Sequence, residues 1–164
     1  MPRYFATPIA LFCAALAGGC SSPASDAKTP PAAESTAPAR DLQITANDTM
    51  KFSVVEIKAK AGERLTVTLV NNGTTPKFSM GHNWVLLTPG TDAQAFVVAA
   101  ADAVTTDYVP AAAKAQIVAS TKLLGPKESN AVTFTVPSSP GRYEFVCSFP
   151  GHFQVGMRGV LIVG

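Results

Sequence analysis

The sequence predicts an all-β fold, a sandwich of about eight short strands with one short helical insertion. Two observations support this prediction. Several short segments between residues 41 and 164 alternate apolar and polar side chains, as strands with one buried face do. Turn-forming runs such as Asn71-Asn72-Gly73 and Pro89-Gly90 separate these segments at short intervals, which is typical of antiparallel sandwiches.

The individual strands follow from the same pattern. Arg64–Val70 alternates strictly up to the turn that follows it, and Ala131–Val136 alternates until Pro137. The other predicted strands are Leu42–Ile44, Val54–Ile57, Asn83–Leu87, Arg142–Cys147 and Gly159–Val163. The segment Thr91–Val104 differs, because it is rich in Ala and begins beside Asp92, a suitable helix cap. We expect one or two helical turns there.

The first 40 residues do not follow the strand pattern. Residues 1–19 hold one early cation, Arg3, and then an apolar run, which predicts a secretion signal too short to span a bilayer. Cleavage after Ala17 and cleavage directly before Cys20 both fit the small residues found there. Residues 20–40 are rich in Ala, Pro, Ser and Thr, so we expect a disordered linker. The folded domain is then 41–164.

The cysteines bear on the chemistry of this domain. Of the three, Cys13 lies in the signal and Cys20 at its end, so Cys147 is the one thiol of the predicted domain and no disulfide forms within it. An unpaired thiol in an exported protein needs protection, which a metal ion would provide. The formal charge of +2 is scattered along the chain, which argues against a nucleic-acid-binding surface.

Four side chains have the types and spacing of a copper site. The whole chain has two histidines: His82, where a loop enters a strand, and His152, in a loop that also holds Cys147 and Met157. Two imidazoles, one thiolate and a weak thioether are the ligands of blue-copper electron-transfer sites. The pattern predicts one type 1 copper ion and one-electron transfer as the function.

The segments Gly81–Leu86 and Cys147–His152 resemble azurin, and Asn47–Met50 and Thr121–Gly125 do too. The resemblance spans about residues 41–164 and implies a cupredoxin fold, a Greek-key sandwich of eight strands. It also implies electron transfer between periplasmic or membrane-surface redox proteins. Azurin's N-terminal disulfide has no counterpart, which leaves the sheet ends without that link.

Two further features modify the resemblance. Met157 is five residues after His152, whereas azurins have four, and this longer loop is similar to that of auracyanin, a membrane-associated relative. The residues that end in Gly18-Gly19-Cys20 resemble a bacterial lipobox, which implies a lipid-modified Cys20 and an anchor at the periplasmic face or cell surface. A soluble periplasmic protein is the alternative.

The resemblance also implies roles for residues around the ligands. The Gly81 carbonyl is expected to contact copper weakly, and Asn83 is expected to hydrogen-bond to the Cys147 loop. Phe149 and Pro150 stiffen that loop and leave fewer donors competing for the thiolate. Simpler interpretations stay open: Gly81 serves backbone geometry, and Met157 packs in the core.

Apolar residues on the loops near the ligands predict an exposed docking surface for redox partners, with packing in the core or within the loops as the alternative. We expect electrons to pass through the exposed edge of His152. The expected partners are cytochromes or membrane electron-transport complexes, contacted by a monomer. The predicted docking residues are Met50, Met80, Phe149, Pro150, Phe153 and Val155.

Three other functions would account for parts of the sequence. A copper-handling protein of the periplasm needs exchangeable ligands, typically many Met or paired Cys, and this chain has four Met in all. An oxidase or nitrite reductase needs further histidine-bound copper, for which no histidines remain, so we expect no enzyme. A zinc-binding or metal-free structural sandwich is the third, because Zn²⁺ accepts a similar ligand set.

Overall fold

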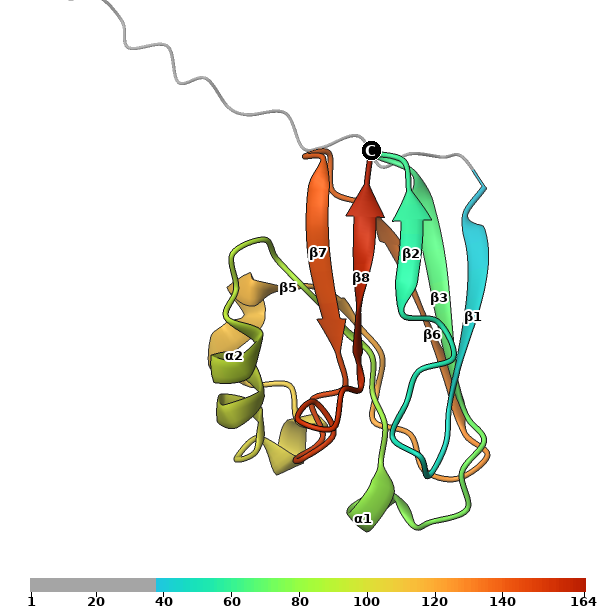
Figure 1. The fold of residues 1–164 in the computed structure, drawn as a ribbon, viewed down its shortest axis with the longest axis vertical. Coiled ribbons are helices and arrows are strands. Elements are labelled where there is room, and N and C mark those ends of the chain that lie inside the picture. Colours follow the sequence, from blue (N-terminus) through green and yellow to red (C-terminus); the bar gives the residue numbers. More distant parts are fainter. Residues whose placement is uncertain (1–37) are drawn as a thin grey trace, which may run out of the picture. The chain divides into compact units, whose positions relative to one another are not determined.

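The structure, a computed structural model, describes residues 38–164. In this part of the chain, eight strands form two sheets (Figure 1). The smaller sheet has the order β1 (Arg40–Ala46), β3 (Arg64–Asn71), β6 (Ser129–Thr135). The larger sheet has the order β2 (Glu56–Ala59), β8 (Arg158–Val163), β7 (Gly141–Val146), β4 (Val85–Leu87), β5 (Ile117–Ser120). The predicted sandwich is therefore confirmed.

The strand pairing is mixed, which differs from the antiparallel arrangement that we predicted. β1 pairs with β3 in parallel, and β2 pairs with β8 in parallel, while the remaining pairs are antiparallel. The cause is the chain path, because after β1 the chain crosses to the other sheet to form β2 before it returns as β3. Alternation along a strand reveals its buried face but carries no information on the direction of its neighbour.

The core lies between the two sheets. Along β3, Leu65, Val67 and Leu69 are fully buried and alternate with partly exposed polar residues, as predicted. Trp84 is fully buried, and its ring lies 5.4 Å from that of Phe145, measured between centroids. Burying such aromatic side chains contributes strongly to stability. The strands next to the loops that carry the predicted ligands are therefore firmly packed against the core.

The predicted helical insertion is present as α2 (Ala93–Ala100), beside the larger sheet (Figure 1). The Asp92 side chain caps it by accepting from the Ala95 backbone N–H at 3.0 Å. Phe96 and Val97 pack in a cluster with Val85, Leu87 and Phe153. The helix thus covers one face of the β4–β7 region and reaches the loop before β8.

Other elements near α2 were not predicted. Two 3₁₀ helices follow it, η1 (Val104–Thr106) and η2 (Ala111–Gln116), and then β5. The first half of the molecule also holds a short helix, α1 (Lys77–Met80), directly before Gly81. The strand predicted at Val54–Ile57 is observed later, as β2. Within residues 38–164, no helix is both long enough and apolar enough to cross a membrane.

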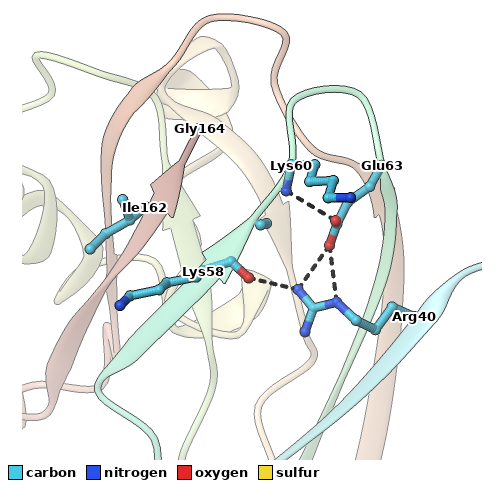
Figure 2. Close-up of a pocket in the computed structure, with 7 residues that line it drawn as sticks. Arg40, Lys58, Lys60, Glu63, Ile162 and Gly164 are labelled. Atoms are coloured by element: carbon cyan, nitrogen blue, oxygen red, sulfur yellow. Dashed lines mark hydrogen bonds and ion pairs between the residues drawn. The ribbon is translucent and has the colours of Figure 1, made fainter.

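A polar link joins the two sheets at the end where the chain terminates. An open pocket of about 660 Å³ lies there, and Figure 2 shows the Arg40 guanidinium between Glu63 and the Lys58 carbonyl. Arg40 donates to Glu63 Oε1 from Nε at 3.1 Å and from Nη2 at 2.8 Å, and Nη2 also donates to the Lys58 carbonyl at 2.9 Å. β1 of one sheet is thereby tied to β2 of the other without a covalent bond.

We expect Arg40→Ala to lower the free energy of unfolding by about 1 kcal/mol, because the lost bonds are partly exposed. Burial would raise the pKa of Glu63, but the Lys60 backbone N–H and the Arg40 guanidinium together hold that pKa below its ordinary value of 4.5. The folded state thus favours ionised Glu63, which adds to the free energy of unfolding. This addition is fully present above pH 4.5 and is lost as pH falls through the lowered pKa of Glu63.

Urea unfolding of both proteins at several pH values tests this expectation. The difference between wild type and Arg40→Ala should be full at pH 7 and shrink as pH falls below 4.5, the ordinary pKa of Glu63. A difference that stays constant down to pH 3 would show that the carboxylate is not involved. The colour expected from the predicted copper site is the control, because this end of the sandwich lies opposite the β7–β8 loop (Figure 1) and the colour should not change.

Candidate metal centre

Three of the predicted ligands converge in the structure. One nitrogen each from His82 and His152 and the sulfur of Cys147 lie within 4.8 Å of one another. Cys147 Sγ is 3.4 Å from His152 Nδ1, and the two imidazole rings are 4.9 Å apart between centroids. Residues 65 and 70 positions apart in the chain are thus brought to one point by the fold. The predicted His–Cys–His cluster exists.

His82 is fixed by a short antiparallel bridge with Leu124. The His82 N–H donates to the Leu124 carbonyl at 3.1 Å, and the Leu124 N–H donates to the His82 carbonyl at 2.8 Å. The buried Asn71 side chain also donates to the Leu124 carbonyl, at 3.3 Å. His82 lies before the first residue of β4, outside the sheet, but these hydrogen bonds to Leu124 hold its backbone in place. Leu124 and Asn71 were not predicted as supports, and no local sequence signal distinguishes them.

The loop between β7 and β8 closes on itself. The Cys147 N–H donates to the Met157 carbonyl at 3.0 Å, and the Met157 N–H donates to the His152 carbonyl at 2.9 Å. The His152 N–H donates to the Phe149 carbonyl at 3.1 Å. Met157 is fully buried and joins the main core cluster together with Cys147. The loop thus places Met157 next to Cys147, and its thioether as a fourth ligand stays a prediction.

Asn83 joins the two halves of the site, as the sequence predicts. Its Oδ1 accepts from the Ser148 backbone N–H at 2.8 Å, and its Nδ2 donates to Ser148 Oγ at 2.8 Å and to the Asp107 carbonyl at 2.9 Å. Because Asn83 follows His82 and Ser148 follows Cys147, the two bonds between Asn83 and Ser148 couple the segment of one ligand to the loop of another. Buried side-chain bonds of this kind orient metal ligands.

A segment after α2 completes the surroundings of the site. Asp107 and Tyr108 both have φ of 58°, in the left-handed region that side-chain-bearing residues rarely adopt. Ser148 Oγ donates to the Tyr108 carbonyl at 2.6 Å, and the Tyr108 ring meets the Phe149 ring edge-on at 5.0 Å. The Phe149 ring in turn lies 4.7 Å from the ring of His152. This support was missed, because Tyr108 is far from the loop in sequence.

Burial sets the ionisation of the site without metal. It raises the pKa of the Cys147 thiol to about 12, although the Asn83 and Phe149 backbone N–H groups stabilise the thiolate. Burial and the neighbouring His82 lower the pKa of His152 to about 4, and burial lowers the pKa of His82. At neutral pH both imidazoles are uncharged and able to donate a lone pair to a metal.

The residues present fit a copper ion. Both ring nitrogens of His82 are buried and lack a hydrogen-bond partner, which is rare for buried polar atoms because each unpaired group is costly. A metal ligand bond would use one of them. A thiolate with two imidazoles suits copper in particular, since soft sulfur and imidazole donors favour it. The chain thus offers a donor set in which a single ion would give a partner to one of the unpaired nitrogens of His82.

Gly81 has a packing reason of its own. A Cβ added there would lie 2.7 Å from the Lys77 carbonyl and 2.9 Å from Leu123 Cγ, so a side chain does not fit without movement. This close approach supports the simpler interpretation, in which Gly81 serves backbone geometry. Contact between its carbonyl and copper stays a prediction.

The predicted docking residues divide by exposure. Pro150 and Val155 are exposed, and Met50 and Met80 are half-buried. Phe149 and Phe153 are buried, because Tyr108 packs on the first and the α2 cluster encloses the second, so their expected exposure is wrong. His152 is only 2% exposed, which also corrects the expectation of an open ring edge. Phe78 on α1, 82% exposed, was not predicted.

Several predictions concern the start of the chain. The secretion signal 1–19, the lipid site Cys20 and most of the linker 20–40 lie outside the described residues. The predicted domain 41–164 begins within β1, whose first residue is Arg40. These predictions keep their status as expectations.

Comparisons with known proteins agree with this geometry. A family model described as copper-binding proteins of the plastocyanin/azurin family matches residues 39–164. Azurin from Pseudomonas chlororaphis is 34% identical over 125 residues, which cover 74% of this chain and 96% of the azurin. Outer membrane protein H.8 from Neisseria gonorrhoeae is 39% identical over 66% of this chain, which spans 60% of that protein's length. The solved structure of reduced auracyanin from Roseiflexus castenholzii has a TM-score of 0.68 and 34% identity, and the match covers 77% of this chain and 99% of the auracyanin.

Proposed function

The chain belongs to the plastocyanin/azurin family of copper-binding proteins, and from this premise we propose that its copper passes electrons between redox proteins of the cell envelope. The protein is a blue-copper electron-transfer protein with one type 1 copper site. The observation that carries this conclusion is the buried cluster of His82, Cys147 and His152. Bound copper supplies the transferable electron by alternating between Cu(II) and Cu(I).

The chain's own residues hold the donor atoms in place. The Leu124 bridge fixes His82, and the Asn83 side chain ties that strand to the loop that holds Cys147 and His152. Since both supports are buried, little movement is available to the donors when the charge of the site changes. A site that does not rearrange loses little energy to reorganisation at each electron hop. Fixed donors therefore serve electron transfer directly.

Met157 is the proposed fourth ligand. Its backbone is bonded to both Cys147 and His152, and its side chain is fully buried in the cluster that holds the cysteine. A weak axial thioether is the usual fourth donor of blue-copper sites and influences their reduction potential. The role of Gly81 as a fifth, weak donor belongs to the same proposal.

The proposed partners are cytochromes or membrane electron-transport complexes, met one at a time by a monomer. Pro150 and Val155 supply exposed apolar surface beside His152 in the loop, and Met80 lies directly before Gly81 and His82. Electron-transfer contacts are small, usually below about 1,200 Å² of buried surface, so a patch of this kind is adequate. The route through His152 would cross the residues that cover it rather than an open ring edge, since only 2% of His152 is exposed.

We further propose that the protein is exported and held at a membrane by a lipid on Cys20. The apolar stretch before Gly18-Gly19-Cys20 supports export, and the relative named outer membrane protein H.8 supports a place at the envelope.

A carrier of electrons is favoured over a carrier of copper or an enzyme. The three donors are between 0 and 2% exposed, whereas metal transfer to another protein needs accessible ligands. Both histidines of the chain lie in this cluster, so no second histidine-bound copper centre is available for oxidase or reductase chemistry.

The test compares the speed of electron exchange with the speed of copper loss. We expect the blue colour of the copper-loaded protein to bleach with a mild reductant and to return with an oxidant over many cycles. An excess of a Cu(I) chelator should remove copper far more slowly than reduction proceeds, because the donors are buried. Protein unfolded in urea, which should lose copper at once, is the control. Copper loss as fast as reduction would instead support a metal-handling role.

A further inference from the structure

The segment between His152 and Met157 has one backbone carbonyl that a distant side chain satisfies. Within the loop, the carbonyls of Gly151, His152 and Phe153 accept from backbone N–H groups of the loop itself, at 3.4, 2.9 and 2.9 Å. The Val155 carbonyl accepts instead from Nζ of Lys51. This bond joins residues 104 positions apart and lies between His152 and Met157.

Lys51 is itself held on both sides. The Met50 N–H before it donates to the Asn47 carbonyl at 3.0 Å, in a turn that gives Met50 a φ of 53°. Phe52 after it is buried, with its ring 5.8 Å from that of Phe145. With the backbone fixed at both neighbours, the side chain of Lys51 extends from a rigid point to the loop.

The ammonium group also lies against the residue that precedes Met157. A Cβ built on Gly156 would be 3.1 Å from Lys51 Nζ, and Gly156 has a φ of 90°, which favours glycine. The absence of a side chain there leaves room for the ammonium group. The Lys51 ammonium group therefore bonds to the Val155 carbonyl and occupies the space beside Gly156, the residue directly before Met157.

We propose that Lys51 is a positioning residue for the copper site, which fixes the Val155–Gly156 segment and with it Met157. The inference rests on the proposed function, because it concerns the chain's residues toward bound copper. It assigns two separable roles to the ammonium group. As a donor it immobilises the loop, and as a fixed positive charge close to the loop it favours the reduced, less positive form of the site.

Three variants separate the two roles. Lys51→Met removes both the donor and the charge, Lys51→Gln keeps a donor without the charge, and Lys51→Arg keeps both. The matched control is Lys58→Met, which removes one positive charge from β2, near the pocket of Figure 2 at the opposite end of the sandwich. Each protein is copper-loaded and reduced, so that the diamagnetic Cu(I) form permits amide hydrogen exchange by nuclear magnetic resonance, and its reduction potential is recorded.

In Lys51→Met we expect the Gly156 and Met157 amides to exchange about tenfold faster than in wild type, because the loop loses one charge-assisted bond. The potential should fall in Lys51→Met and Lys51→Gln. Lys51→Arg and Lys58→Met should resemble wild type in both measurements. If Lys51 only stabilised the fold, Lys51→Met would lower the stability of the protein. It would not selectively speed amide exchange at Gly156 and Met157, and it would not lower the reduction potential.

The inference is overturned if exchange at Gly156 and Met157 and the potential in Lys51→Met both equal those of Lys58→Met. A failure of the proposed function appears differently, because wild type itself would then lack the blue colour and a reversible potential. The two failures are therefore distinguishable in one set of samples.

Discussion

Replacing Cys147 with serine is expected to abolish the intense blue band and the narrow copper hyperfine splitting. Both features require a thiolate bound to Cu(II), and Cys147 supplies the one sulfur of the His–Cys–His cluster. A serine hydroxyl is a hard donor that stays protonated near neutral pH, so it replaces the cysteine in size but not in bonding. Visible absorption and electron paramagnetic resonance of the purified, copper-loaded variant measure the loss.

Cys20→Ser is the matched control, since it makes the same chemical change at a cysteine outside the His–Cys–His cluster. It should keep the full colour while releasing the protein from membranes, if the proposed lipid is attached there. Colour that survives in Cys147→Ser would contradict the copper–thiolate site. Colour lost in both variants would point to general damage by serine substitution.

The ligands were predictable from sequence because their residue types are scarce. The chain has two histidines, and Cys147 is the one cysteine in the described part, so few combinations exist that could bind a soft metal. The spacing of Cys147, His152 and Met157 restricts them to one hairpin loop. Asn83 was predictable through the family resemblance, and the structure confirms its bonds across the site.

The exposure of the loop was not predictable in the same way. In sequence, nothing distinguishes Phe149 and Phe153 from exposed loop residues. In the structure, Tyr108 packs on Phe149, and α2 packs on Phe153. This cover comes from a segment some 40 residues earlier, as the Ser148–Tyr108 bond shows, and no local pattern encodes the contact. Phe78 is the reverse case, an aromatic residue that the four-residue helix α1 leaves exposed.

Parallel pairing of β1 with β3 escaped prediction for a related reason. Alternation is a property of one strand and reports its buried face, whereas direction is a property of two strands and of the path between them. The residue pattern near β2 predicts a strand, but it does not show that this strand belongs to a different sheet from β1 and β3. The local sequence thus predicts where strands and helices form. Strand direction and side-chain exposure depend on contacts between segments that are far apart in the chain.

Asn83→Leu is expected to lower the free energy of unfolding by about 3 kcal/mol or more, the largest stability effect that we predict. Leucine has a similar size but cannot serve the Ser148 N–H and the Asp107 carbonyl, which lose the Asn83 side chain as a partner. Each buried polar group left unpaired costs about 1–3 kcal/mol. Urea unfolding of the copper-free protein measures the loss.

Two control variants test whether the effect of Asn83→Leu comes from the hydrogen bonds that join Asn83 to Ser148. Ser148→Ala keeps the bond from the Ser148 N–H to Asn83 Oδ1 and removes the hydroxyl alone, so it should cost less than Asn83→Leu. Asn72→Leu alters an exposed asparagine and should change stability by at most about 0.5 kcal/mol. If Asn83 joins the strand of His82 to the loop of Cys147, its loss should also broaden the copper hyperfine pattern, because the donors then adopt more than one arrangement. An Asn83→Leu protein with wild-type spectra and a stability loss no greater than that of Ser148→Ala would show that the ligands are held by the sheets alone.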